Sequence, residues 1–244
     1  MSTEWFQDWF GSEYLELYSH RNSESARTEI SWISKELKLN SNSKVLDVAC
    51  GAGRHLSALL STTQHCYGGD LSMPLLTTAI SKDAQLLGRI LRYDLRSLPF
   101  ANESFDVALS LFTSFGYFID DEQHLLSLRE VTRILKPAGT FMFDFLNAPK
   151  TIRDLVPESR RSLPGKELLE KRSYNRETKR IEKQINIKTR AAEKNFIESV
   201  RAYSESEISA LIKQAGLRII KQFGSLAGAP FNSEADRLIV IAVK

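Results

Sequence analysis

Apolar and polar positions change their period along the chain, and this change predicts where strands and helices lie. Between Lys44 and Lys136, short runs rich in Val, Ile and Leu alternate with longer segments of helical period. Such alternation is typical of βαβ units that build a parallel sheet. We therefore expect an α/β fold whose first strand is "KVLDVA", residues 44–49.

The same alternation predicts the rest of the sheet and the helices that cover it. Ser72 is a residue type that caps helix N-termini, and "KPAG" at 136–139 is expected to stop a helix. The expected strands cover 65–69, 88–93, 104–112 and 140–146, and the expected helices cover about 54–60, 73–85 and 121–135.

Beyond the fifth strand the βα rhythm is lost. The stretch "RIEKQINIKTR" alternates apolar and polar residues, which suits antiparallel strands with one solvated face. A helix near 206–215 then leads to "LRIIKQF" and "RLIVIAVK", two strands close enough to pair as an antiparallel hairpin at the sheet edge. We predict an N-terminal helical cap at 1–40, a core at 41–147 and 203–244, and an inserted β-rich subdomain at 148–202.

The carboxyl ends of the strands carry the candidate ligand site, because open α/β sheets bind ligands there. "ACGAG" at 49–53 lets the backbone approach a ligand, and the helix after it offers free N–H groups. Asp70 ends the second strand nineteen residues after Gly51, about the spacing at which a carboxylate meets ribose hydroxyls. Asp94 ends the third strand. A glycine turn followed by acids on the next two strands indicates a nucleoside site.

At these positions the chain resembles the class I S-adenosylmethionine-dependent methyltransferases. Ala49 stands where that family's usual D-x-G-x-G-x-G has its first glycine, and a residue this small still admits the ligand. The N-terminal "WFGSEYLELYSHR" (9–21) resembles the segment that folds over the cofactor in the small-molecule branch. The matching core segments are "VLDVACGAG" (45–53), "GGDLS" (68–72), "RYDLRSLPFANESFDVALSLF" (92–112) and "LREVTRILKPAGTFMFDF" (128–145).

The resemblance implies a Rossmann-like sheet with S-adenosyl-L-methionine as cofactor, and it assigns roles to individual residues. Gly51 and Gly53 would border the methionine portion of the cofactor, and Asp70 would bind the ribose hydroxyls. Asp94 with Leu95 would hold the adenine.

Further residues are brought to the cofactor by the same resemblance. Asp47 is expected to contact the turn's backbone or the cofactor's amino group, and Arg54 the cofactor's carboxylate. Tyr14 and Tyr18 are expected to close over the cofactor, with packing inside an amphipathic helix as the alternative. The remaining predicted cofactor neighbours are Ala49, Leu71 and Leu111.

The segment "LFTSFGYF" (111–118) is expected to face the transferred methyl group. Tyr117 is our candidate for contact with the acceptor, with simple packing of the loop as the alternative. Among the four histidines, we single out His20 as a general base. His65 is expected to be structural or solvated, and His124 to lie on an exposed helix face.

Asp144 also has two interpretations. It alternates with Phe143 and Phe145, so it either points into the pocket or is a buried, hydrogen-bonded acid. The loop at 111–118 holds no acidic pair for a divalent metal beside a catechol, so we expect no metal. It also lacks an Asn-Pro-Pro-Tyr sequence, which by the resemblance counts against methylation of adenine N6 or of glutamine.

Three other functions are compatible with parts of the sequence. A dinucleotide-dependent oxidoreductase needs a third glycine where the chain has Leu56. An RNA methyltransferase is the main alternative, because residues 171–190 hold eight basic and two acidic side chains. Those basic residues interleave with isoleucines, however, and no RNA-binding motif accompanies them. A non-enzymatic scaffold is disfavoured by the intact acids.

Bulk properties change this picture little. The net charge is +3, no apolar run approaches the roughly 18 residues that span a bilayer, and the two cysteines have no metal-type spacing. We expect a cytoplasmic enzyme without membrane or nucleic-acid partners, and with a homodimer through the insertion as an open alternative. The sequence thus predicts a small-molecule N- or O-methyltransferase acting by in-line displacement.

Overall fold

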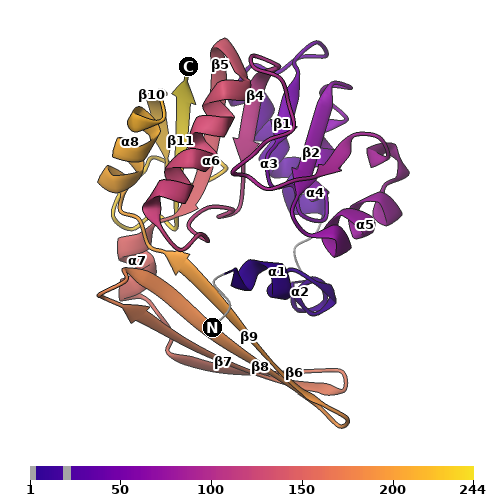
Figure 1. The fold of residues 1–244 in the computed structure, drawn as a ribbon, viewed down its shortest axis with the longest axis vertical. Helices are drawn as coiled ribbons and strands as arrows, with labels where there is room; N and C mark the ends of the chain where they lie inside the picture. Colours follow the sequence, from indigo (N-terminus) through magenta and orange to yellow (C-terminus); the bar gives the residue numbers. More distant parts are fainter. Residues whose placement is uncertain (1–3, 19–22) are drawn as a thin grey trace.

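A computed structural model describes residues 4–18 and 23–244, and its core is one seven-stranded sheet. The strands are β1 (Val45–Asp47), β2 (Cys66–Asp70), β3 (Ile90–Arg92), β4 (Phe105–Ser110), β5 (Leu135–Leu146), β10 (Arg218–Phe223) and β11 (Arg237–Val243). Their order is β10-β11-β5-β4-β1-β2-β3 (Figure 1). Strands β1 to β5 are parallel, and β11 pairs antiparallel with both β5 and β10. The predicted parallel sheet with a C-terminal antiparallel hairpin is confirmed.

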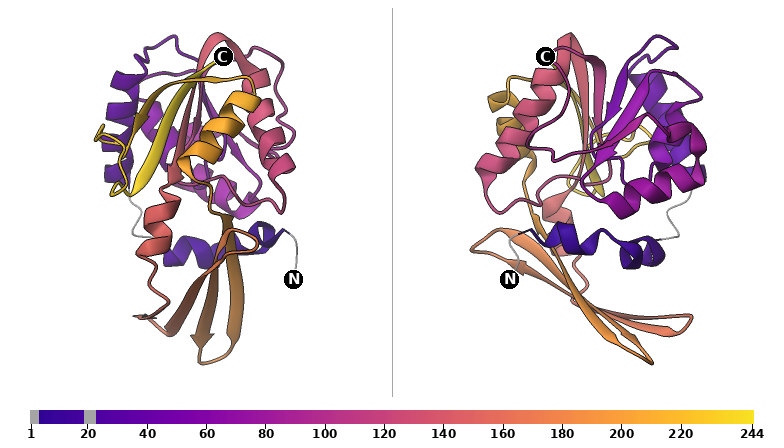
Figure 2. Two further views of the ribbon diagram at one scale, coloured as in Figure 1. Left: turned by 90° about the vertical axis from the view of Figure 1, so that its left-hand side faces the viewer. Right: turned by 45° about the vertical axis from the view of Figure 1, so that its right-hand side comes forward.

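Helices cover both faces of this sheet, which is seen almost edge-on in the left view of Figure 2. One face packs against α3 (Ser23–Glu36), α4 (Arg54–Leu59) and α5 (Met73–Lys82). The other packs against α6 (Asp121–Ile134) and α8 (Glu205–Gln214). The two apolar layers hold the strands rigidly, so the residues that follow each strand are presented from a fixed frame.

The predicted ends of helices and strands agree only in part with the structure. Ser72 caps α5, accepting a hydrogen bond from the Leu75 N–H at 3.3 Å, as predicted. The helix ends earlier than expected, because Asp83 caps a separate short 3-10 turn, η1 (Ala84–Leu86). The helix α6 ends at Ile134, just before "KPAG" at 136–139, as predicted, but β5 begins earlier than expected, so "KPAG" lies inside that strand, where Ala138 takes a left-handed φ of 61°.

The prediction for His124 is wrong. Its side chain is 0% exposed, and it lies on the buried face of α6 together with Leu128 and Val131. Tyr203, which follows the second sheet, covers this face, and its hydroxyl is 2.8 Å from His124 Nδ1. The spacing of His124, Leu128 and Val131 at i, i+4 and i+7 already indicated burial, whereas the covering residue comes from 79 positions further along the chain.

A second sheet of four antiparallel strands follows α7 (Ala148–Arg153). Its strands pair in sequence order: β6 (Glu158–Leu163), β7 (Lys166–Asn175), β8 (Arg180–Thr189) and β9 (Glu193–Arg201). The short helices α1 (Trp5–Trp9) and α2 (Ser12–Leu17) lie between the two sheets (Figure 1). Trp9 and Leu17 pack there against Leu168, Ile185 and Ile187, so the N-terminal helices and the second sheet share a small apolar core.

The described residues contain no helix that combines the length and the apolar character needed to cross a membrane.

Candidate functional site

A cavity of about 960 Å³ lies between the carboxyl ends of β1, β2, β3 and β4 and the N-terminal helices. The structure brings nearly all predicted site residues to its wall. His20 lies outside the described residues, and Gly53 does not line the cavity. The predicted residues that do are Tyr14, Tyr18, Asp47, Ala49, Gly51, Arg54, Asp70, Leu71, Asp94, Leu95, Leu111 and Tyr117.

Asp70 organises the glycine turn. One of its carboxylate oxygens accepts a hydrogen bond from the Gly51 N–H at 3.0 Å, and the other accepts one from the Ser72 N–H at 2.9 Å. Gly51 has a φ of +53°, a conformation that L side chains rarely adopt. Burial raises the pKa of Asp70, while these backbone donors oppose the rise. The acid therefore joins the turn after β1 to the start of α5 and still faces the cavity.

Asp47 has an unsatisfied acceptor in the same wall. Its side chain is buried, and no described residue donates a hydrogen bond to its Oδ1. Burial and the neighbouring Asp70 charge raise its pKa to about 7, against the opposing effect of Arg54. A buried polar atom without a partner is rare in folded proteins. The position suits a ligand group that carries positive charge or donates a hydrogen bond.

Gly53 has a packing role that the sequence did not reveal. It caps α4 with a φ of +75°, and an added Cβ would lie 2.7 Å from Leu86 Cδ1 and 2.9 Å from Ala79 Cβ. The glycine thus lets α4 start close against α5 and η1. Gly53 is not among the residues that line the cavity, and its predicted place beside the methionine portion of the cofactor stays a prediction.

Asp94 is held by a cation that sequence reasoning missed. Arg96 donates to both of its carboxylate oxygens, at 2.9 and 2.6 Å, and also to Glu4 and Gln123, each at 2.8 Å. Burial tends to raise the pKa of Asp94, but the hydrogen bonds from Arg96 outweigh it and lower this pKa. The acid stays charged at the cavity wall, and Arg96 connects it to the residue just before α1. The position of Arg96, two residues after the strand-end acid Asp94, was the available signal in the sequence.

Arg54 lines the cavity, and its guanidinium is also held by residues outside it. Its Nη1 donates to Glu29 of α3 at 3.1 Å, and its guanidinium lies 4.5 Å from the centre of the Phe112 ring. His55 Nε2 lies 2.5 Å from the same Glu29 oxygen. Burial lowers the pKa of His55. These contacts fix the start of α4 against α3.

An aromatic cluster forms the roof of the cavity. The Tyr117 ring centre lies 5.1 Å from that of Trp5 and 5.6 Å from that of Phe10, and its hydroxyl donates to the Thr113 carbonyl at 2.5 Å. Tyr117 therefore both lines the cavity and packs the loop. Phe10, which lines the cavity, and Trp5, which packs against Phe10, were not predicted as site residues, although the helical spacing of aromatics from Trp5 onward was a usable signal.

The two cap tyrosines also reach the second sheet. Tyr14 packs its ring against Trp9 and Tyr18, with centres 5.8 and 4.8 Å apart. The Tyr18 hydroxyl donates to Glu198 at 3.2 Å and accepts from Lys183 Nζ at 2.7 Å. Packing and cavity lining therefore occur together at these residues.

Asp144 is a buried, hydrogen-bonded acid and does not line the cavity. It accepts from the Phe112 N–H at 2.7 Å and from Arg237 Nε at 2.8 Å. Phe112 and Thr113 both have a left-handed φ, 64° and 63°. Asp144 thus holds the first turn of the loop that leads to Tyr117.

Part of the chain matches a known family, and one uncharacterised relative is similar over nearly the whole chain. Residues 45–139 match a family model described as a methyltransferase domain. Protein MJ1252 of Methanocaldococcus jannaschii is 28% identical over 239 residues, which cover 98% of this chain and 84% of that protein.

Solved structures share the fold. An S-adenosylmethionine-dependent methyltransferase from Clostridium acetobutylicum superposes with a TM-score of 0.79 at 20% identity, covering 94% of this chain and 95% of the other. CalS10, an amino pentose methyltransferase from Micromonospora echinaspora solved with bound S-adenosylmethionine, gives a TM-score of 0.69 at 19% identity, with 95% and 96% covered.

Proposed function

Because residues 45–139 match a methyltransferase domain and the fold is shared with S-adenosylmethionine-dependent methyltransferases, we propose that the chain is such an enzyme and that it methylates a nitrogen or oxygen atom of a small molecule. The observation that carries this proposal is the roof over the strand ends. The cavity of about 960 Å³ lies at the upper end of the range for small-molecule sites. A cavity of this size has room for a compact acceptor beside the cofactor, and the aromatic side chains that cover it favour a small acceptor.

The cavity residues fit the cofactor. The unsatisfied Oδ1 of Asp47 is an acceptor for the cofactor's ammonium group, and its carboxylate would form a charge-assisted hydrogen bond there. Asp70 would accept from the ribose hydroxyls, and Asp94 with Leu95 would hold the adenine. Arg54 is the candidate partner for the cofactor's carboxylate.

Catalysis then depends mainly on geometry. The cofactor supplies a methyl group on a sulfonium, so the acceptor atom needs to approach in line from the opposite side. We propose that Tyr117 contacts the acceptor and helps to fix this approach. His20 stays a prediction for the base that an oxygen nucleophile needs.

The contacts of the second sheet favour a small molecule over RNA. Several cations of the 171–190 stretch are engaged internally: Lys183 lies 2.7 Å and Arg172 also 2.7 Å from Glu170, and Arg180 is buried. Phosphate recognition needs such side chains to be exposed. The solved neighbour CalS10, which acts on an amino pentose, is in line with a small acceptor.

We also propose that the enzyme acts in the cytoplasm, where its two reduced, buried cysteines are in a suitable environment. A homodimer through the second sheet stays a prediction.

A transfer assay tests the proposed acceptor class. Methyl-labelled S-adenosylmethionine is incubated with the protein and either a small-metabolite extract or bulk tRNA, each at two salt concentrations. We expect label in the metabolite fraction, and loss of that label in Asp70→Ala. Transfer to tRNA that falls steeply with salt would instead support the RNA alternative.

A further inference from the structure

Arg180, at the start of β8, is a buried cation bound almost entirely by backbone carbonyls. Its Nη1 donates to the Phe118 carbonyl at 2.9 Å, and its Nη2 donates to the carbonyls of Gly116 and Tyr117 at 3.0 and 3.2 Å. On the other side it donates to Ser199 Oγ and to the Ser199 carbonyl, both at 2.7 Å. One guanidinium therefore joins three successive residues of the loop at 116–118 to the second sheet.

The electrostatics of this contact are unusual. Arg180 forms no salt bridge with any residue in the described ranges 4–18 and 23–244, and burial lowers its pKa. Burying a charge without a counter-ion is costly, so the carbonyl dipoles need to be well placed to offset that cost. The planar fork of five donors in an arginine matches several fixed acceptors at once, which the single ammonium of a lysine does not.

A second contact between the loop and the sheet lies beside the first. The Arg201 N–H donates to the Gly116 carbonyl at 2.8 Å. Gly116 has a φ of +88°, and an added Cβ would lie 3.0 Å from both the Arg201 carbonyl and Val200 Cγ1. The loop thus fits against the end of β9 with no space for a side chain at this glycine.

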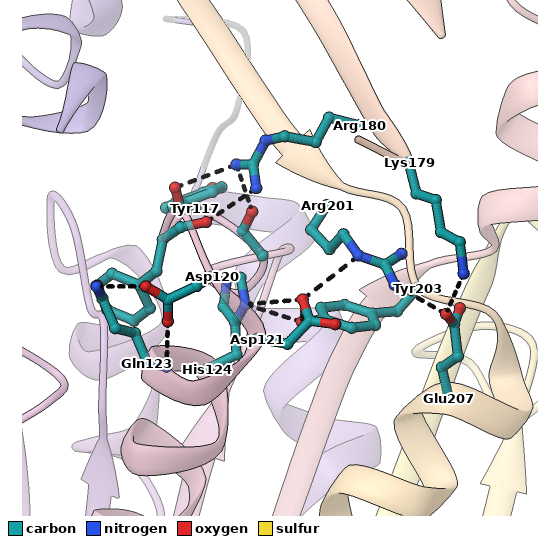
Figure 3. A network of polar contacts seen from close by, with 12 residues as sticks. Tyr117, Asp120, Asp121, Gln123, His124, Lys179, Arg180, Arg201, Tyr203 and Glu207 are labelled. Atoms are coloured by element: carbon teal, nitrogen blue, oxygen red, sulfur yellow. Dashed lines mark hydrogen bonds and ion pairs between the residues drawn. The ribbon is translucent and has the colours of Figure 1, made fainter. Parts of the chain in front are cut away.

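The end of β9 is itself anchored to the core sheet's helices, as Figure 3 shows. Arg201 pairs with Glu207 of α8 at 2.8 Å and with Asp121 of α6 at 3.4 Å. The Tyr203 hydroxyl donates to Asp121 at 2.5 Å and lies 2.8 Å from His124 Nδ1. Arg180 therefore acts from a strand pair that is fixed to the core, and its contact with the loop is not a loose surface contact.

We propose that Arg180 is a positioning residue for the methyl acceptor: it fixes the 116–118 backbone so that Tyr117 holds its place in the cavity wall. This inference rests on the proposed function, in which Tyr117 contacts the acceptor. It makes the second sheet a part of the active site, because the sheet sets the geometry of the residue nearest the acceptor.

The position of Tyr117 is measured by ¹⁹F NMR of protein labelled with 3-fluorotyrosine. The Tyr117 signal is assigned by its loss in Tyr117→Phe. We expect Arg180→Gln and Arg180→Lys to move or split this signal, while the signals of the buried Tyr93 and the core Tyr67 stay in place. Arg160→Gln, which removes an exposed arginine of β6, is the matched control and should leave the Tyr117 signal unchanged.

An unchanged Tyr117 signal in both Arg180 variants would overturn the proposal. So would an equal movement of all tyrosine signals, because that indicates general loosening of the fold. If Arg180→Gln does not fold, Arg180→Lys keeps the charge and carries the test.

Ligand measurements separate this inference from the proposed function. S-adenosylhomocysteine affinity should stay within about twofold of the wild type in the Arg180 variants, since they leave the cofactor acids intact. Their kcat/KM for a metabolite acceptor should fall, by roughly 100-fold for a misplacement near 1 Å. If the wild type methylates only RNA, the proposed small-molecule acceptor is wrong. The Tyr117 signal still reports whether Arg180 positions the loop.

Discussion

Replacing Asp47 by Asn should remove most of the pH dependence of S-adenosylhomocysteine binding. The pKa of Asp47 is raised to about 7 by burial and by Asp70, with Arg54 opposing. An α-ammonium group has a pKa near 8, so the ligand stays cationic below pH 7. The ligand therefore binds the ionised form of the Asp47 carboxylate. At lower pH, where Asp47 is protonated before binding, this carboxyl group has to release its proton when the ligand binds.

The size of the effect follows from the two protonation states. With a pKa of about 7, half of the Asp47 side chains are ionised at pH 7 and roughly 1% at pH 5. If the ammonium keeps Asp47 ionised in the complex, wild-type affinity should fall by roughly 50-fold between these pH values, about 2.3 kcal/mol. Asp47→Asn should bind roughly 10-fold or more weakly at pH 8, because a charged hydrogen bond is lost.

Isothermal titration at pH 5, 6, 7 and 8 measures both effects. Asp70 also has a raised pKa and is coupled to Asp47, so the wild-type slope belongs to the pair, and its reduction in Asp47→Asn reports the part that requires Asp47. Asp106→Asn is the control, because this acid pairs with Lys136 at the opposite end of β4 and its pKa is lowered. A flat wild-type profile, or an equal slope in Asp47→Asn, would refute the reasoning.

Further predictions concern stability. Gly53→Ala should cost roughly 2 kcal/mol or more in urea unfolding, from the left-handed φ and the crowding by Leu86 and Ala79, whereas Gly88→Ala, with a φ of +78° and open space, should lose less. Burial lowers the pKa of His124 to about 4, below its unfolded value, so folding stability should decline by roughly 3 kcal/mol as pH falls from 6.5 to 4. His124→Gln should flatten this decline and the exposed His65→Gln should not. Asp144→Asn should destabilise the fold by roughly 3 kcal/mol, measured by the same unfolding curves, because it breaks a buried ion pair.

The strand ends were predictable because the periods of strands and helices, the glycines after the first strand and the aspartates that end the next two strands specify them. The apolar runs placed β1 to β4 in the right order, and parallel strands bring their carboxyl ends to one edge. Asp47, Asp70 and Asp94 therefore reached one cavity in the structure, as the sequence indicated. These features depend on local pattern and on chain order.

The remaining features depend on contacts between distant segments. The close packing of Gly53 against Leu86 could not be predicted, because it depends on where the chain returns after α5. The hydrogen-bond partner of His124 could not be predicted either, because Tyr203 comes from beyond the second sheet, although the spacing of His124 with Leu128 and Val131 indicated its burial. Arg180 looked like one of many basic residues on a solvated strand, yet its partners in the loop at 116–118 lie more than sixty positions away. Period and propensity carry no information on such pairings.

Titration of the wild type and Asp70→Ala with S-adenosylhomocysteine tests most directly that the strand-end acids form the cofactor site. The wild type should bind one ligand per chain, and Asp70→Ala should weaken binding by 1 to 3 kcal/mol, roughly 5- to 150-fold. Asp70→Asn, which keeps an acceptor oxygen for the Gly51 N–H, controls for disruption of the turn. No binding by the wild type at millimolar ligand, or full affinity in Asp70→Ala, would contradict the account.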